Sequence, residues 1–178
     1  TGTMSGHDWN NCDPEKPIPV LQISGTDDYV VPMDGSMSAA GGWGGAPDIN
    51  KIIEYWSNLN SCNKKEIVKI ANVNQNDNSY VVLEKNYNEN QSNEVWLYTV
   101  YGRGHTWPGA YIPLAGINTN QDFSASEKIW QFFSKYDING LVEAVNVNEI
   151  EKEEKNYDLQ VNYEKLNTGA YRVVGSLV

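Results

Sequence analysis

The sequence predicts an α/β fold in which parallel strands are flanked by helices, followed by a short irregular or β-rich tail. Short, strongly apolar runs suit buried strands, and other segments carry apolar residues at helical spacing. After about residue 137 the composition shifts toward Asn, Glu and Lys, which is typical of chain beyond the end of a packed domain. With 178 residues, of which 40% are hydrophobic, the chain can bury one core of ordinary size.

Two predicted strands form the centre of this fold. Residues 18–24 make a mostly apolar run that prolines open and Gly25 closes, which suits an interior parallel strand buried on both faces. Residues 94–100 are rich in β-branched and aromatic side chains and predict a second strand. Loops containing Gly and Pro follow both strands, at residues 25–32 and 102–109.

A hairpin or insertion and two helices complete the α/β region. The strand-like runs 66–73 and 80–83 flank a turn-rich Asn-Gln-Asn-Asp-Asn-Ser segment whose Asn-rich flanks are expected on the surface. Pro47 suits the first position of one helix, and the capping box Ser124 to Glu127 predicts the start of another. The apolar residues at helical spacing are Ile49, Ile52, Ile53 and Trp56 in the first helix, and Ile129, Phe132, Phe133 and Tyr136 in the second.

The predicted domain limits follow from composition. We expect an α/β domain over residues 1–137, a polar linker over 138–156 and a short tail over 157–178. The tail has strand-like runs around a turn at Gly169 but is too short to bury a core alone, so we expect a truncated sorting segment or another appendage.

Charge and hydropathy exclude several classes of partner. The net charge of -10 and the pI of about 4.6 disfavour nucleic-acid binding, since no Lys/Arg-rich stretch offsets them locally. No apolar run approaches the roughly 20 residues of a membrane-spanning helix, so no membrane partner is expected. The sequence begins at Thr1 without a signal-like segment, which leaves a processed or truncated N-terminus open.

Metal and cofactor sites are not expected. The chain has 2 Cys and 2 His, and these residues do not group into the four convergent ligands of a structural metal site. Cys12 and Cys62 could form one disulfide in an oxidising compartment, but their spacing does not decide whether they meet.

An acid and a base follow the two central strands. Asp28 lies in the loop after residues 18–24, and His105 lies in the loop after residues 94–100. Ligands of open α/β sheets bind outside the carboxyl ends of the strands, so these two side chains are expected at one crevice. A neutral His can take a proton from a serine hydroxyl while a carboxylate on its other nitrogen fixes the tautomer. Asp28 and His105 are therefore candidate catalytic residues.

Several segments resemble a known enzyme family. Residues 19–32, 41–47 and 104–109, the last reading Gly-His-Thr-Trp-Pro-Gly, and the helix 123–133 are similar to the polyhydroxybutyrate depolymerase and feruloyl (acetylxylan) esterase family of α/β-hydrolases. The similarity extends to about Tyr136. It implies that the chain is the C-terminal part of an α/β-hydrolase sheet, comprising its last parallel strands and flanking helices, and that the activity is ester hydrolysis.

The resemblance also assigns residues. It places the acid at Asp28 rather than Asp27, because the family pattern is Gly, Thr, any residue, Asp, and it places the base at His105. The nucleophilic serine and the oxyanion hole are implied upstream of Thr1, in a missing N-terminal half of the domain, on the G-x-S-x-G turn that precedes the acid and base in α/β-hydrolases. Ser5 is one residue out of register for such a turn and is given no catalytic role.

The sequence departs from the family near both triad members. The family often has His at the position of Ser24, a small residue at Asp27 and Gly at Arg103. Arg103 places a cation two residues before the proposed base. Its side chain either approaches the imidazole and disfavours protonation of that ring, or points to water.

The resulting functional hypothesis is a secreted serine carboxylic-ester hydrolase, extracellular or periplasmic, acting on a polysaccharide-linked or polyester substrate. Trp107 and Trp43 are the candidates that line the substrate crevice, although half-buried packing explains Trp43 slightly better. Residues 1–178 alone are expected to be inactive because they lack the nucleophile. The alternative is a non-catalytic carbohydrate-binding module derived from a hydrolase fold, which the 6 Trp and 11 Tyr residues permit. A G-x-S-x-G turn before Thr1 would distinguish the two.

Overall fold

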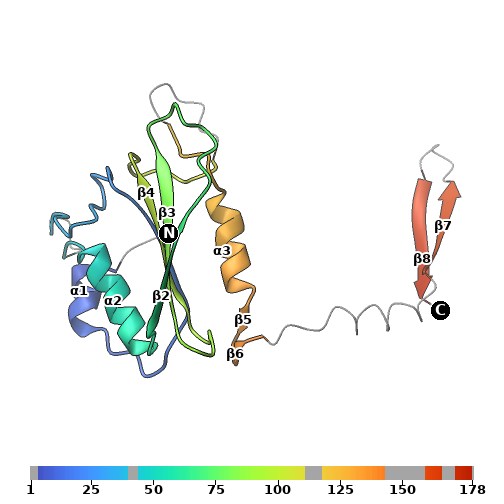
Figure 1. Ribbon diagram of the computed structural model, residues 1–178. Helices are drawn as coiled ribbons and strands as arrows, with labels where there is room; N and C mark the ends of the chain where they lie inside the picture. Colours follow the sequence, from blue (N-terminus) through green and yellow to red (C-terminus); the bar gives the residue numbers. More distant parts are fainter. Residues whose placement is uncertain (1–3, 40–43, 111–117, 143–158, 166–170, 178) are drawn as a thin grey trace. The chain divides into compact units, whose positions relative to one another are not determined.

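A computed structural model of the chain has two compact units, Thr1–Val142 and Glu143–Val178. The first contains a four-stranded mixed sheet, three helices and a two-stranded hairpin among its described residues, so the predicted α/β class is confirmed (Figure 1). The second contains one antiparallel hairpin. The residues that the structure describes are 4–39, 44–110, 118–142, 159–165 and 171–177.

The strands of the main sheet lie in the order β1-β4-β3-β2. Their bounds are Val20–Gly25 for β1, Lys64–Lys69 for β2, Tyr80–Tyr87 for β3 and Val95–Tyr101 for β4. The two predicted central strands are indeed parallel neighbours, with Val20 opposite Val95 and Gly25 opposite Val100. The described sheet ends at β1, so the expectation of an interior strand was wrong for this sheet. A continuous apolar run such as that of β1 indicates that both faces of a strand are buried, but it does not indicate how many strands lie beside it.

The two strand-like runs between β1 and β4 form the antiparallel hairpin β2–β3, with β3 also antiparallel to β4. β2 starts and ends earlier than the predicted run 66–73. β3 extends beyond the predicted run 80–83 to Tyr87, which pairs with Lys64 at the start of β2. Beyond β2 the chain leaves the ladder: the side chain of Asn72 donates to the Ser79 carbonyl oxygen at 3.0 Å, and the Val73 amide donates to Asp122 Oδ1 at 2.8 Å.

Helices cover both faces of the sheet. α2 (Ile49–Leu59) packs on one face and α3 (Ala125–Phe133) on the other, as Figure 1 shows. Because alternate strand residues point to opposite faces, β4 divides its side chains between the two helices. The core against α2 contains Ile49, Ile52, Ile53, Val95 and Leu97. The core against α3 contains Leu21, Ile23, Val81, Leu83, Tyr98, Val100, Phe123, Ala125 and Phe132.

The first predicted helix starts later than expected. Asp48 is its N-cap, with Oδ1 accepting from the Asn50 amide at 2.7 Å, so Pro47 precedes the helix instead of occupying its first position. A carboxylate that receives an orphan amide of the first turn is the stronger start signal. The short helix α1 (Gly6–Asn11) is capped by Ser5, whose hydroxyl oxygen accepts from the Asp8 amide.

The second predicted helix, α3, begins as expected. Ser124 Oγ accepts from the Glu127 amide at 3.3 Å. The helix ends at Phe133, however, so Tyr136 is not helical and lies in β5 (Tyr136–Asp137). Its ring still reaches the same core, with a centroid 5.5 Å from that of Phe132.

Two small hairpins complete the description. β5 pairs with β6 (Gly140–Leu141), which lies inside the stretch expected to be a polar linker. In the second unit, β7 (Leu159–Lys165) pairs with β8 (Tyr171–Leu177), in agreement with the strand-like runs of the tail. The predicted turn at Gly169 lies outside the described residues, and the three domain limits stay a prediction.

Candidate active site

The parallel pair β1 and β4 brings the predicted acid and base together. Both strands end at the same edge of the sheet, and the loop after each carries one of the two residues. His105 Nδ1 lies 2.9 Å from Asp28 Oδ2, which is hydrogen-bond distance between residues 77 positions apart in the sequence. The Asp28 side chain is 10% exposed and that of His105 is 57% exposed. A nearly buried carboxylate thus holds a ring that faces outward.

The Asp28 carboxylate is fixed by its own loop. Oδ1 accepts from the amides of Val30 and Val31, each at 2.9 Å, which leaves Oδ2 for the imidazole. An ionised carboxylate only accepts hydrogen bonds, so the neutral ring carries its proton on Nδ1 and its lone pair on Nε2. Within the described residues Nε2 makes no hydrogen bond. His105 therefore keeps a proton-accepting nitrogen that is not engaged within the described residues, on a side chain that is 57% exposed.

Asp27 does not take part in this contact. Its Oδ1 accepts from the hydroxyl of Thr26 at 2.9 Å, and its side chain lies in an exposed turn. The structure thus separates the two adjacent carboxylates: Asp28 contacts the imidazole, and Asp27 bonds within a local turn.

The two loops are bonded directly to each other. The Thr26 amide donates to the Val100 carbonyl at 3.1 Å, and the Asp27 amide donates to the Arg103 carbonyl at 3.0 Å. The Gly102 amide donates to Thr26 Oγ1 at 2.9 Å. Because these bonds join the backbones just before Asp28 and His105, they fix how far apart the acid and the base lie.

Arg103 follows neither alternative considered from the sequence. Its guanidinium is directed into the loop between β2 and β3, where Nη2 donates to the Asp77 carbonyl at 2.8 Å and lies 3.2 Å from Asp77 Oδ2. Nη1 donates to the carbonyl of Gly102 at 2.8 Å. The side chain is only 11% exposed, so it does not point to water. Its ion pair is with the hairpin loop.

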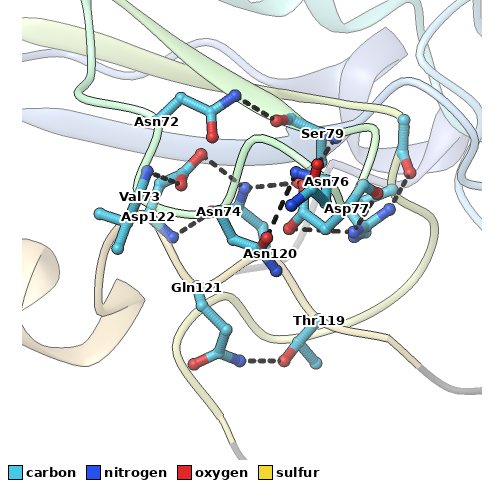
Figure 2. A network of polar contacts seen from close by, with 12 residues as sticks. Asn72, Val73, Asn74, Asn76, Asp77, Ser79, Thr119, Asn120, Gln121 and Asp122 are labelled. Carbon is cyan, nitrogen blue, oxygen red and sulfur yellow. Dashed lines mark hydrogen bonds and ion pairs between the residues drawn. The ribbon is translucent and has the colours of Figure 1, made fainter.

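A polar network behind the His105 loop was not predicted. Figure 2 shows residues of the β2–β3 loop joined to residues 119–122. Asn120 is fully buried and donates to Ser79 Oγ at 2.8 Å and to Asp122 Oδ2 at 2.9 Å. The sequence signal was only a stretch rich in Asn and Asp, which indicates turns. Nothing in that composition identifies which of its members is buried.

Of the two predicted substrate-contacting residues, Trp107 lies close to the base in the same loop. Its Nε1 donates to Ser126 Oγ at 3.1 Å, which anchors the indole to the first turn of α3, and the residue is 41% exposed. Part of its ring is therefore available to a ligand. Trp43 lies outside the described residues.

In the part of the chain that the structure describes, Cys12 and Cys62 are both free thiols, and burial raises the pKa of Cys62. Three or more His, Cys, Asp or Glu side chains do not gather into a possible metal site anywhere among the described residues. The described helices also include none that is long and apolar enough to cross a membrane.

A separate polar pocket of about 330 Å³ lies near the start of β4, at the opposite end of that strand from His105. Its charged residues pair among themselves: Lys85 with Glu66 at 2.9 Å, and Lys135 with Glu94. Burial and the neighbouring Glu94 raise the pKa of Tyr136. The pocket is lined by Glu66, Lys85, Tyr87, Gln91, Glu94, Trp96 and Lys135. It is too far along β4 to belong to the Asp28–His105 site.

Comparison with known proteins does not assign the chain to a family. No protein-family model matches the chain, and no curated protein matches it at a significant level.

Proposed function

We propose that Asp28 and His105 are the acid and base of a catalytic triad in a serine carboxylic-ester hydrolase of the α/β-hydrolase type. The observation that carries the proposal is the 2.9 Å hydrogen bond between Nδ1 and a fixed, nearly buried carboxylate, made by a His105 side chain that is 57% exposed. The serine belongs, in this proposal, to a part of the protein outside residues 1–178. The parallel pair β1–β4 with helices on both faces is compatible with the end of such a sheet.

The chemistry follows from the tautomer. Nε2 takes the proton of the serine hydroxyl while the serine oxygen attacks the ester carbonyl. The imidazolium, stabilised by Asp28, then returns this proton to the departing alcohol, which leaves an acyl-enzyme. In the second half, Nε2 takes a proton from water, the hydroxide attacks the acyl group, and the proton returns to the serine oxygen as the acid is released.

The substrate class is an ester linked to a polysaccharide or belonging to a polyester, and the enzyme acts outside the cytoplasm. Both parts of this proposal rest on the resemblance carried by Gly25-Thr-Asp-Asp28 and Gly104-His-Thr-Trp-Pro-Gly109. The partly exposed indole of Trp107, held by Ser126, supplies a rigid surface for a sugar or aromatic ring beside the base.

The test is ester hydrolysis by the full-length protein. Chromogenic short-chain, acetyl and feruloyl esters are assayed with the wild type, His105→Ala and Asp28→Asn. His105→Ala should lose about 10⁶-fold in kcat because the base itself is removed, and Asp28→Asn about 10⁴-fold because the tautomer is no longer fixed. Asp27→Asn is the matched control and should retain wild-type kcat, since that carboxylate bonds only within its own turn.

Two results would contradict the proposal. Equal losses in Asp27→Asn and Asp28→Asn would show that the carboxylate contacting His105 has no special role. Wild-type inactivity on all three ester types, with saturable binding of xylan, would instead support the non-catalytic carbohydrate-binding module.

A further inference from the structure

The loop that carries His105 is connected at both of its ends to one other loop of the molecule, directly at its start and through Asn120 at its end. At its start, the Arg103 guanidinium contacts the carbonyl and the carboxylate of Asp77. At its end, the Gly109 amide donates to the Asn120 carbonyl at 2.8 Å, and Asn120 Nδ2 donates to Ser79 Oγ at 2.8 Å. Asp77 and Ser79 both belong to the loop between β2 and β3.

Asp77 closes this connection into a ring of contacts. Its Oδ1 accepts from the amide and the hydroxyl of Ser79, at 2.8 and 2.9 Å, while its Oδ2 faces Arg103. A displacement of the hairpin loop would therefore move both ends of the His105 loop together. Figure 2 shows the hairpin side of this ring.

The Arg103–Asp77 ion pair and the hydrogen bonds of Asn120 are largely shielded from water, which strengthens them. The side chains of Arg103 and Asp77 are 11% and 13% exposed, and Asn120 is 0% exposed. Hydrogen bonds and ion pairs are stronger in such surroundings, and leaving one partner unpaired is costly. The planar guanidinium of Arg103 contacts the Gly102 carbonyl, the Asp77 carbonyl and Asp77 Oδ2 at once. A lysine ammonium on a flexible stem does not reproduce this arrangement.

The His105 loop needs such support for a physical reason. Glycines stand at positions 102, 104 and 109, and His105 lies at the centre of a tight turn in which the Thr106 amide donates to the Gly104 carbonyl at 2.8 Å. The imidazole itself is 57% exposed and, among the described residues, makes one hydrogen bond. Its position is thus set by the backbone of its loop rather than by packing around the ring.

We propose that Arg103 and Asp77 are positioning residues for the base, which use the β2–β3 loop as a brace that holds His105 against Asp28. The proposal rests on the proposed function for its kinetic consequences, but the position of the ring can be measured without turnover. Removing the brace should lower kcat about 10- to 100-fold, the effect expected of a misplaced catalytic group, with KM changed by less than about twofold.

The test uses three variants of the full-length protein: Arg103→Met, Arg103→Met with Asp77→Asn, and Arg103→Lys. The single Met variant leaves an uncompensated buried carboxylate and should be destabilised. The double variant removes both charges while keeping an acceptor for Ser79, so its thermal midpoint should recover toward the wild type. We expect its kcat to stay low despite that recovery, which a purely structural ion pair would not produce.

A second readout follows the imidazole directly. Long-range ¹H–¹⁵N correlations of the histidine rings report which nitrogen is protonated, and the signal that disappears in His105→Gln is the signal of the base. The wild type should show His105 protonated at Nδ1, and the double variant should show a mixture of tautomers. This readout remains informative if no ester is hydrolysed, so failure of the proposed function and failure of the brace are distinguishable.

A double variant with recovered stability, wild-type kcat and an unchanged Nδ1–H tautomer would overturn the proposal. If the double variant does not fold, Arg103→Lys decides, since it keeps the charge and loses only the fork. A lowered kcat with unchanged KM and a mixed tautomer in Arg103→Lys supports the brace, and wild-type values of kcat and tautomer in that variant overturn it.

Discussion

Gly25 and Arg103 approach each other so closely that a Cβ on Gly25 would lie 2.2 Å from the Arg103 carbonyl oxygen. Gly25 is the last residue of β1, and the same carbonyl accepts the Asp27 amide at 3.0 Å. The close approach is therefore part of what joins the loop of the acid to the loop of the base. It also explains why glycine stands at this position although its backbone angles do not require it.

Gly25→Ala should separate the two loops. The new methyl group would meet backbone atoms, which cannot rotate away as a side chain can. We therefore expect the free energy of unfolding to fall by at least roughly 3 kcal/mol. In the full-length protein ester hydrolysis should fall with it. Urea unfolding of the variant and the wild type measures the first effect.

Gly104→Ala is the graded control. Its added Cβ would lie 3.1 Å from the Asp27 carbonyl oxygen, a tight contact that small shifts relieve, so a loss of about 1 kcal/mol is expected. An equal effect of both substitutions would show that the contact between Gly25 and Arg103 is not what limits the approach of the loops.

A second prediction concerns Asn60, the C-cap of α2, which is 2% exposed. Its Nδ2 donates to the carbonyls of Ile18 and Asn93 at 2.6 and 2.8 Å, and its Oδ1 accepts from the Ile18 amide at 3.2 Å. The side chain thus joins the end of a helix to the segments entering β1 and β4. Asn60→Ala leaves these backbone groups without partners and should lower the free energy of unfolding by about 2–4 kcal/mol.

Asn58 offers the matched control because it is exposed on the same helix. Asn58→Ala should be neutral or slightly stabilising, since Ala has the higher helix propensity. Chemical denaturation of both variants under identical conditions makes the comparison. A loss below about 0.5 kcal/mol for Asn60→Ala would mean that water replaces the three bonds at little cost.

The sequence was sufficient for the parts of the site that depend on periodicity and strand ends. A mostly apolar run located β1, and a run rich in β-branched and aromatic residues located β4. The carboxyl ends of parallel neighbours necessarily meet at one edge, which is why Asp28 and His105 could be expected together. The start of α3 was predictable because a Ser followed by Glu three residues later has a specific bonding pattern.

The remaining features depend on which residues meet across the fold. Arg103 binds Asp77, 26 positions earlier, and neither its charge nor its neighbours in sequence select that partner. Pro47 and Asp48 are both helix-start signals, and only the bonds made by the Asp48 carboxylate decide between them. Tyr136 fits the helical period of α3 yet reaches the core from a strand, because a residue just after a helix can contact the same ring.

The last prediction concerns alkaline pH and Tyr98, which is 1% exposed in the core against α3. Burial raises the pKa of Tyr98 from its usual value of 10.0 to about 12, because the phenolate would lie in apolar surroundings. The unfolded chain ionises near pH 10.0 and the folded chain near 12, so the contribution to stability is complete below pH 10.0 and is lost as the pH rises to about 12. The total loss should be about 2–3 kcal/mol.

Urea unfolding in steps from about pH 9 to pH 12 measures this effect in the wild type and in Tyr98→Phe. Tyr98→Phe lacks the ionisable group. Its free energy of unfolding should therefore rise relative to that of the wild type as the pH increases from 10.0 to about 12. That difference cancels the parallel contribution of Tyr136, whose pKa burial also raises. Tyr29→Phe is the control, since this side chain is 87% exposed and the substitution removes a hydroxyl outside the core. A pH-independent difference between Tyr98→Phe and the wild type would show that the Tyr98 hydroxyl reaches water in the folded protein.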